Sequence, residues 1–129
     1  MANETETLKI LLKIQDMIEY AYPALKQYPK SERYAMVEDM KRSMDNMLLL
    51  AIRAEKKYYK TNTLQDLDIE IAFLRKEVEL SYKLGFLPER KRNVMFDYLS
   101  EIGRMLGGWI KSCSQRERKR EAYHNGSRL

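Results

Sequence analysis

The chain contains few of the residues that build disulfides, metal centres and tight turns. Its 129 residues include one cysteine, one histidine, five glycines and three prolines. Because Cys113 is alone, no internal disulfide is possible, and with no apolar leader segment at the N-terminus we expect a cytoplasmic protein. Charged residues interrupt every apolar run before the ~18 residues that a membrane helix needs, so we expect no membrane insertion.

The same scarcity leaves little material for catalysis. Di-iron sites in helical bundles need Glu-x-x-His pairs on two helices, whereas the one histidine, His124, lies near the C-terminus. The sequence also lacks zinc-ligand spacing, a glycine-rich phosphate loop and a Ser/His or Cys/His nucleophile pair. Carboxylate pairs such as Asp66 with Asp68 and Glu77 with Glu79 fit solvated helix faces. We therefore expect no metal, no cofactor and no enzyme activity.

Few turn-forming residues among many Leu, Met, Glu, Lys and Ala indicate an all-α fold with long helices. Apolar residues recur with the helical period in four segments, which predicts helices at about residues 5–27, 32–60 and 63–84 and from 89 to a point between 113 and 121. Short loops between such helices favour an up-down-up-down four-helix bundle. We expect this bundle to occupy residues 1–115, followed by a basic, frayed tail over residues 116–129.

Local signals set the expected helix ends. Ser31 is a candidate N-cap for the second helix, and Thr63 with Asp66 resembles a capping box for the third helix. Gly85 supplies a C-terminal stop, and Pro88 begins the fourth helix. The second helix is expected to reach Lys60, and this places Tyr58 on its core-facing arc.

The third helix carries two apolar stripes on nearly opposite sides. The first stripe contains Leu67, Ile71, Leu74, Val78 and Tyr82, and the second contains Ile69, Phe73, Leu80 and Leu84. One bundle cannot easily bury both stripes, so we expect this helix to be sandwiched. It would lie either centrally within its own fold or between its own fold and a neighbouring subunit.

Three glycines, Gly103, Gly107 and Gly108, interrupt the apolar pattern of the fourth helix. Each costs roughly 1 kcal/mol relative to alanine in a helix interior, so we expect something to approach this backbone closely. Tight packing within one subunit and contact between subunits are the two open interpretations. The candidate residues for an oligomer interface are Ile69, Phe73, Leu80, Leu84, Gly103 and Gly107.

The basic charge is concentrated in the last third of the chain. Residues 1–87 hold 14 basic and 14 acidic side chains, whereas residues 88–129 hold 10 and 5. This asymmetry points to a polyanionic partner such as nucleic acid, with a solvated helix end as the alternative. Tyr58, Tyr59 and Tyr123 are candidates for base stacking, although core or surface tyrosines are commoner. The candidate nucleic-acid-binding residues are Arg90, Lys91, Arg92, Arg104, Lys111, Arg116, Arg118, Lys119 and Arg120.

Three segments together resemble a known family: Tyr22-Pro23, residues 28–32 (YPKSE) and residues 100–111 (SEIGRMLGGWIK). Over roughly residues 8–112 the chain resembles the accessory variability determinant (Avd) proteins of diversity-generating retroelements. The resemblance implies a four-helix bundle that assembles into a basic, barrel-shaped homopentamer. It also implies a non-catalytic partner of the retroelement's reverse transcriptase and template RNA during mutagenic copying into cDNA.

Two alternatives stay open at this point. Four-helix proteins encoded within ribosomal RNA intervening sequences share the fold more loosely, and a purely structural helical oligomer would also fit the apolar pattern. The genes beside this one would distinguish them, since a reverse transcriptase gene with near-identical repeats favours the retroelement. The residues beyond Lys111 are not part of the specific resemblance, so a role for Arg116, Arg118, Lys119 and Arg120 depends on charge alone.

Overall fold

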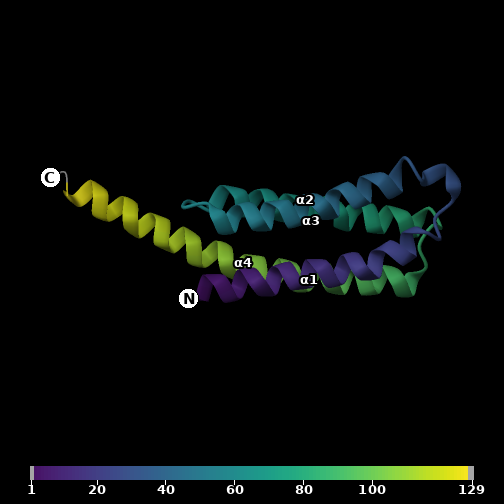
Figure 1. Ribbon diagram of the computed structural model, residues 1–129, viewed down its shortest axis with the longest axis horizontal. Coiled ribbons are helices and arrows are strands. Elements are labelled where there is room, and N and C mark those ends of the chain that lie inside the picture. Colours follow the sequence, from purple (N-terminus) through teal and green to yellow (C-terminus); the bar gives the residue numbers. More distant parts are fainter. Residues whose placement is uncertain (1, 128–129) are drawn as a thin grey trace.

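The computed structural model describes the backbone of residues 2–127 and the side chains of residues 7–123. It consists of four α-helices and a short 3-10 helix: α1 (Ala2–Leu25), η1 (Lys30–Glu32), α2 (Met36–Lys56), α3 (Thr61–Lys83) and α4 (Glu89–Ser127). Each helix packs against its two neighbours in the cyclic order α1, α2, α3, α4. Successive helices run in opposite directions (Figure 1), so the predicted up-down-up-down four-helix bundle is confirmed.

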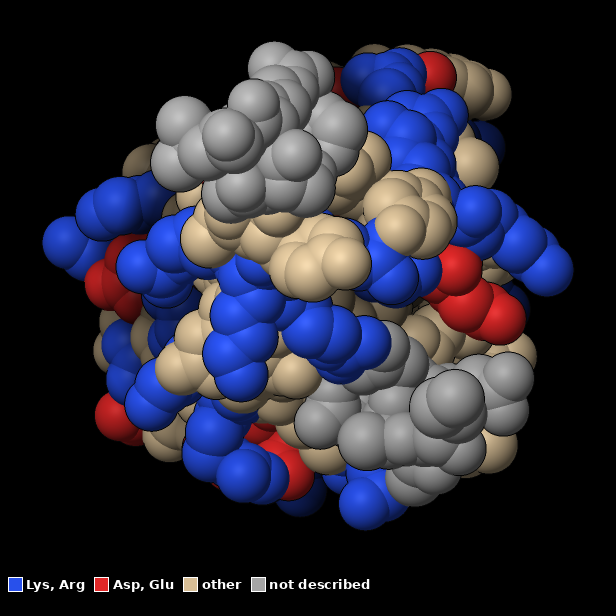
Figure 2. Space-filling model, turned by 90° about the vertical axis from the view of Figure 1, so that its left-hand side faces the viewer, with Lys and Arg blue, Asp and Glu red and all other residues tan. Residues whose placement is uncertain are grey.

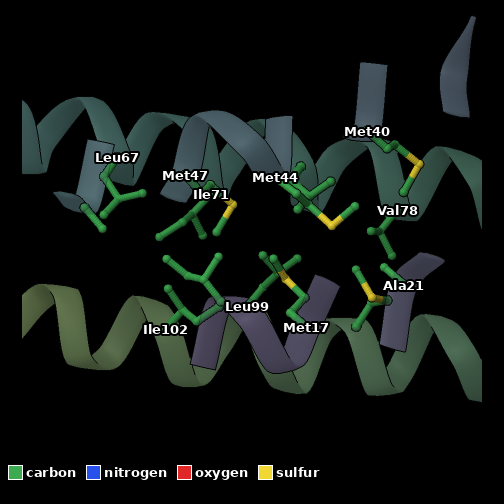
Figure 3. Packing of buried hydrophobic residues seen from close by; sticks show 14 of the residues in the cluster. Met17, Ala21, Met40, Met44, Met47, Leu67, Ile71, Val78, Leu99 and Ile102 are labelled. Carbon is green, nitrogen blue, oxygen red and sulfur yellow. The ribbon is translucent and has the colours of Figure 1, made fainter. Parts of the chain in front are cut away.

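One apolar core runs along the bundle axis, and all four helices contribute to it (Figure 3). The predicted core stripes are buried because residues three and four apart lie on one helix face. Methionines fill much of the interior, with Met17, Met44 and Met47 fully buried. Leu67, Ile71, Leu74 and Val78 form the buried face of α3, while Leu99, Ile102, Leu106 and Trp109 form that of α4.

The local capping predictions for α2 and α3 are wrong. Ser31 lies inside η1, and α2 begins only at Met36, because a series of turn hydrogen bonds after Pro29 delays the helix. The third helix begins at Thr61, and Thr63 is buried within its first turns. Its N-terminus is capped by a side chain of α4 that no local pattern could indicate. Gly85 adopts a positive φ of 81° after α3, which confirms the predicted stop.

The second helix is shorter than expected, and this changes the place of Tyr58. The helix ends at Lys56, and Lys57 has an extended backbone with ψ of 148°. Tyr58 therefore lies in the connection between α2 and α3, where 67% of its surface is exposed, and its predicted place in the core is wrong.

The fourth helix is longer than expected. It has 39 residues, against 21 to 24 for the other three, and continues to Ser127 where a frayed tail was expected. Its C-terminal part extends beyond the rest of the bundle (Figure 1). Arg128 lies outside the described residues, as does the side chain of His124. Among the described helices, none has the length and apolar character that crossing a membrane requires.

Candidate nucleic-acid interface

One end of the bundle concentrates the positive charge. There the connection between α2 and α3 meets the projecting part of α4 (Figure 1). Residues 53–60 and 111–123 hold nine basic and three acidic side chains, an excess of six against a net charge of +5 for the whole chain. In Figure 2, which faces this end, Lys and Arg side chains far outnumber Asp and Glu. We call this region the basic end.

The loop at the basic end is fixed to α2 by Lys60. Its Nζ donates hydrogen bonds to the carbonyl oxygens of Ala54 at 2.7 Å, Glu55 at 2.9 Å and Lys57 at 2.7 Å. The carbonyls of Ala54 and Glu55 belong to the last turn of α2, and Lys57 is the residue directly after it. The last turn of a helix has no further helical amides to bond and carries the negative end of the helix dipole. The ammonium group of Lys60 therefore closes α2 and holds the loop against it.

The same loop is fixed to α4 by Glu117. Its Oε1 accepts hydrogen bonds from the backbone N of Lys60 at 2.7 Å and of Thr61 at 3.3 Å, while its Oε2 accepts one from the Thr61 hydroxyl. Burial acts to raise the pKa of Glu117, but these hydrogen bonds and the Lys60 charge outweigh it, so the pKa lies below its ordinary value. The carboxylate thus caps the N-terminus of α3 and stays ionised at neutral pH.

Two tyrosines project from this pinned loop. Tyr58 and Tyr59 are 67% and 59% exposed, and their rings meet edge to face with centroids 4.9 Å apart. The guanidinium of Arg120 lies over the Tyr58 ring, 4.2 Å from its centroid. The rings border a pocket of about 230 Å³, whose lining residues are Lys57, Tyr58, Tyr59, Lys60, Cys113, Arg116, Glu117 and Arg120.

The structure places the candidate nucleic-acid-binding residues at both ends of the bundle, with Arg104 between them on α4. Arg116 and Arg120 line the pocket, and Arg118 and Lys119 are exposed on α4 beside it. Arg104, Lys111 and Arg118 follow at intervals of seven residues, which places them along one exposed face of α4. Arg104 also donates a hydrogen bond to Glu101 at 2.6 Å.

Arg90, Lys91 and Arg92 lie at the opposite end, about 40 Å from Arg116 along the helix axis. Arg92 is only 19% exposed, with its guanidinium 4.1 Å from the Tyr82 ring centroid. It also pairs with Glu89 at 3.5 Å. These contacts give Arg92 a structural role within the subunit, whereas Arg90 is exposed.

A second basic pocket was not anticipated from the sequence. It has a volume of about 340 Å³ and is lined by Leu25, Lys26, Tyr28, Pro29, Lys30, Arg33, Val37 and Lys41. Tyr28 packs against Phe86 with ring centroids 5.8 Å apart, which places the pocket beside the start of α4. Its four basic residues lie within residues 1–87, where basic and acidic side chains are equal in number. Only the local spacing of Lys26, Lys30 and Arg33 could have indicated them.

The glycines of α4 are not explained by packing within the subunit. A Cβ atom added at Gly103, Gly107 or Gly108 would meet nothing within 4 Å, so tight packing inside one subunit is ruled out. Gly103 instead borders a groove of about 860 Å³ between α3 and α4. The second apolar stripe of α3, formed by Ile69, Phe73, Leu80 and Leu84, is exposed, so α3 is not sandwiched centrally within its own fold.

These features define a class of protein: an all-helical bundle with a basic, aromatic end, exposed apolar stripes and no cluster of metal-binding side chains among the described residues. A family model described as bAvd-like matches residues 8–113 of the chain. The chain therefore belongs to the bAvd-like family, and the resemblance seen in the sequence is confirmed. No protein with curated annotation matches it. The matched range contains the glycines and Trp109 but ends before Arg116.

Proposed function

We propose that the protein is a non-catalytic accessory factor of a diversity-generating retroelement. In this role it binds the reverse transcriptase of the element together with template RNA or its cDNA, and it supports mutagenic copying in the cytoplasm. Membership in the bAvd-like family carries the assignment to the retroelement. The excess of basic side chains at one end supports the nucleic-acid part, because phosphate contacts supply most of the affinity in sequence-tolerant binding.

We further infer that the protein acts as a homo-oligomer, and the family resemblance suggests a barrel-shaped pentamer. Two separate apolar surfaces are exposed: the second stripe of α3 and a set on α1 and α2 that contains Leu8, Leu12, Leu49 and Ile52. Two different surfaces that pair head to tail between copies generate a ring when the rotation from copy to copy closes, and an open filament when it does not. The open backbone at Gly103 and Gly107 supports close approach of a neighbouring copy.

Oligomerisation would turn one modest basic end into a multivalent surface. Copies arranged side by side in a ring present their basic ends on the same side, so several weak contacts act on one nucleic-acid chain. Linked contacts raise the effective concentration of each site and can strengthen binding 10²-fold or more, at an order-of-magnitude level. A rigid scaffold of this kind can hold the template RNA and the polymerase together without an active site of its own.

The decisive experiment is co-purification of this protein with the reverse transcriptase encoded beside its gene, combined with cDNA synthesis from the template RNA. We expect the wild-type protein to retain the polymerase and to change the yield of cDNA. If it does neither, the retroelement assignment fails, and a location of the gene within a ribosomal RNA gene would support the intervening-sequence alternative.

A further inference from the structure

The two loop tyrosines at the basic end differ from the structural tyrosines of this protein. Tyr28 is a structural tyrosine: only 6% of it is exposed, and its hydroxyl lies 3.7 Å from the Met40 sulfur. Tyr58 and Tyr59 instead contact each other and leave most of their ring surfaces to solvent. Two adjacent exposed rings contribute little to the core, so their presence calls for a role outside the subunit.

The loop presents these rings in a fixed arrangement. Lys60 fastens its start to the C-terminus of α2, and Glu117 fastens its end to the N-terminus of α3. A loop held at both ends loses little conformational freedom when a ligand binds, which favours affinity. The rings are therefore ordered before any ligand arrives.

The charge around the rings selects an anionic partner. Lys57, Arg116 and Arg120 line the pocket, and the one acidic lining residue, Glu117, is already bonded to the N-terminus of α3. The guanidinium of Arg120 lies over the Tyr58 ring, 4.2 Å from its centroid, so a cation and an aromatic ring are held side by side. Flat rings next to cations match a nucleobase attached to a phosphate backbone. An acidic peptide would use the cations but not the ring faces.

We propose that Tyr58 and Tyr59, with Arg116 and Arg120, form a stacking site for unpaired nucleobases of single-stranded nucleic acid. This inference rests on the proposed nucleic-acid function and assigns it a location. Unpaired bases expose their faces to aromatic rings, whereas base pairs in a duplex are stacked on one another and offer only edges and phosphates. The site therefore distinguishes single strands from duplexes, with little dependence on sequence.

Equilibrium binding to fluorescently labelled oligonucleotides tests this site. The probes are a single-stranded RNA, a single-stranded DNA of the same sequence, the RNA duplex, and a DNA strand with abasic positions throughout its centre. The double variant Tyr58→Ala/Tyr59→Ala should bind both single strands on the order of tenfold to a hundredfold more weakly. Its binding to the duplex and to the abasic strand should change less than twofold, an estimate that follows from unaltered phosphate contacts.

Matched variants separate stacking from other effects. Tyr58→Phe/Tyr59→Phe keeps the rings and should retain wild-type affinity. Tyr34→Ala removes a tyrosine of the α1–α2 connection that is even more exposed, at 82%, and should have no effect. Arg116→Ala/Arg120→Ala should weaken binding to every probe and flatten the salt dependence. Circular dichroism and light scattering verify the fold and assembly of each variant.

The outcomes distinguish failure of the stacking site from failure of the proposed nucleic-acid function. If the arginine variant loses binding while the tyrosine double variant binds single strands normally, the stacking site is refuted and the nucleic-acid function stands. If the double variant binds single strands, duplex and abasic strand equally weakly, the tyrosines only support the loop and the stacking site is again refuted. If the wild-type protein binds none of the probes, both the stacking site and the proposed nucleic-acid function fail.

Discussion

Both ends of the bundle carry basic residues beside aromatic rings but use them differently. At the end where α4 begins, Arg92 lies against the Tyr82 ring and pairs with Glu89, and Tyr28 packs on Phe86. At the basic end, Arg120 lies over an exposed ring, and the neighbouring cations of α4 face solvent. The comparison teaches that a cation with an aromatic neighbour is structural when both are partly buried and the cation is ion-paired, and available for binding when the ring is exposed.

Charge reversal provides the largest test of this difference. We expect Lys57→Glu combined with Arg116→Glu and Arg120→Glu to weaken RNA binding by roughly 10²-fold or more at low salt, and the salt slope to fall by about 2 to 3. The variant Arg90→Glu/Lys91→Glu, which reverses two charges at the other end, should weaken binding by less than about tenfold, and Arg116→Glu/Arg120→Glu reverses the same number at the basic end for direct comparison. The measurement is a salt series of binding isotherms for each variant. Equal losses from the two ends would remove the functional distinction between them.

Gly107→Leu tests whether assembly brings the basic ends together. A side chain at this position meets open space within the subunit, so the helix should tolerate it, yet it would obstruct a neighbouring copy. We expect light scattering to show a shift toward the 15.4 kDa monomer and RNA binding to lose its multivalent gain. Gly107→Ala is the smaller control, and in an isolated subunit it should stabilise α4 by up to about 1 kcal/mol. A wild-type protein that is monomeric at micromolar concentration contradicts the inferred oligomer.

Arg92→Ala should reduce stability, whereas Arg90→Ala should not. The Arg92 side chain loses its contact with Tyr82 and its pairing with Glu89, which together predict a loss of about 1 kcal/mol in the free energy of unfolding. Arg90 is exposed, and its replacement should change stability by less than about 0.5 kcal/mol. Urea unfolding followed by circular dichroism measures both values. Similar stability of the two variants would show that the contacts of Arg92 contribute nothing net.

The sequence predicts the features of this molecule that depend on helical period. Leu74 and Val78 were expected on one apolar face because apolar neighbours recur three and four residues away, and both are buried. Ile69 and Phe73 were expected on a second face for the same reason, and both are exposed. Within a helix, the period therefore indicates which residues share an apolar face, while packing of the bundle decides which of the two apolar faces of α3 joins the core.

Features that depend on contacts between distant residues were not predictable. The N-terminus of α3 is capped by Glu117, which lies 56 residues beyond Thr61, so the local pattern of Thr63 and Asp66 was misleading. The early end of α2 moved Tyr58 out of the core and created the ring pair at the basic end. The burial of Arg92 likewise depends on where α3 places Tyr82, which charge counting does not reveal.

The smallest expected effect concerns pH, because the pKa values of two carboxyl groups, Glu77 and Glu117, are shifted in opposite directions. Burial, with a smaller contribution from the charge of Asp39, raises the pKa of Glu77, and its Oε2 is buried without a hydrogen-bond partner in the described part of the chain. A raised folded pKa favours the folded state when the group is protonated, so this contribution is present at acid pH and is lost as pH rises through the folded value. Glu77→Gln should remove this loss of stability, so the free energy of unfolding should depend less on pH above about pH 4.3.

Glu117 should show the reverse dependence. Burial opposes its ionisation, but the hydrogen bonds from Thr61 and Lys60 lower its pKa below the ordinary value. The stability that ionised Glu117 contributes is therefore fully present above about pH 4.3 and is lost as pH falls through its lower pKa in the folded state. Glu117→Gln should lower the free energy of unfolding by about 1 kcal/mol at neutral pH, as expected for a lost helix cap. Under acid conditions the variant and the wild type should be equally stable. Urea unfolding between about pH 3 and about pH 8 measures both profiles.

Because Glu117 also holds the tyrosine loop, its variant should bind single-stranded RNA more weakly at neutral pH, while Glu77→Gln should bind like wild type. Equal effects of the two variants on RNA binding would contradict a role for the pinned loop in presenting the rings.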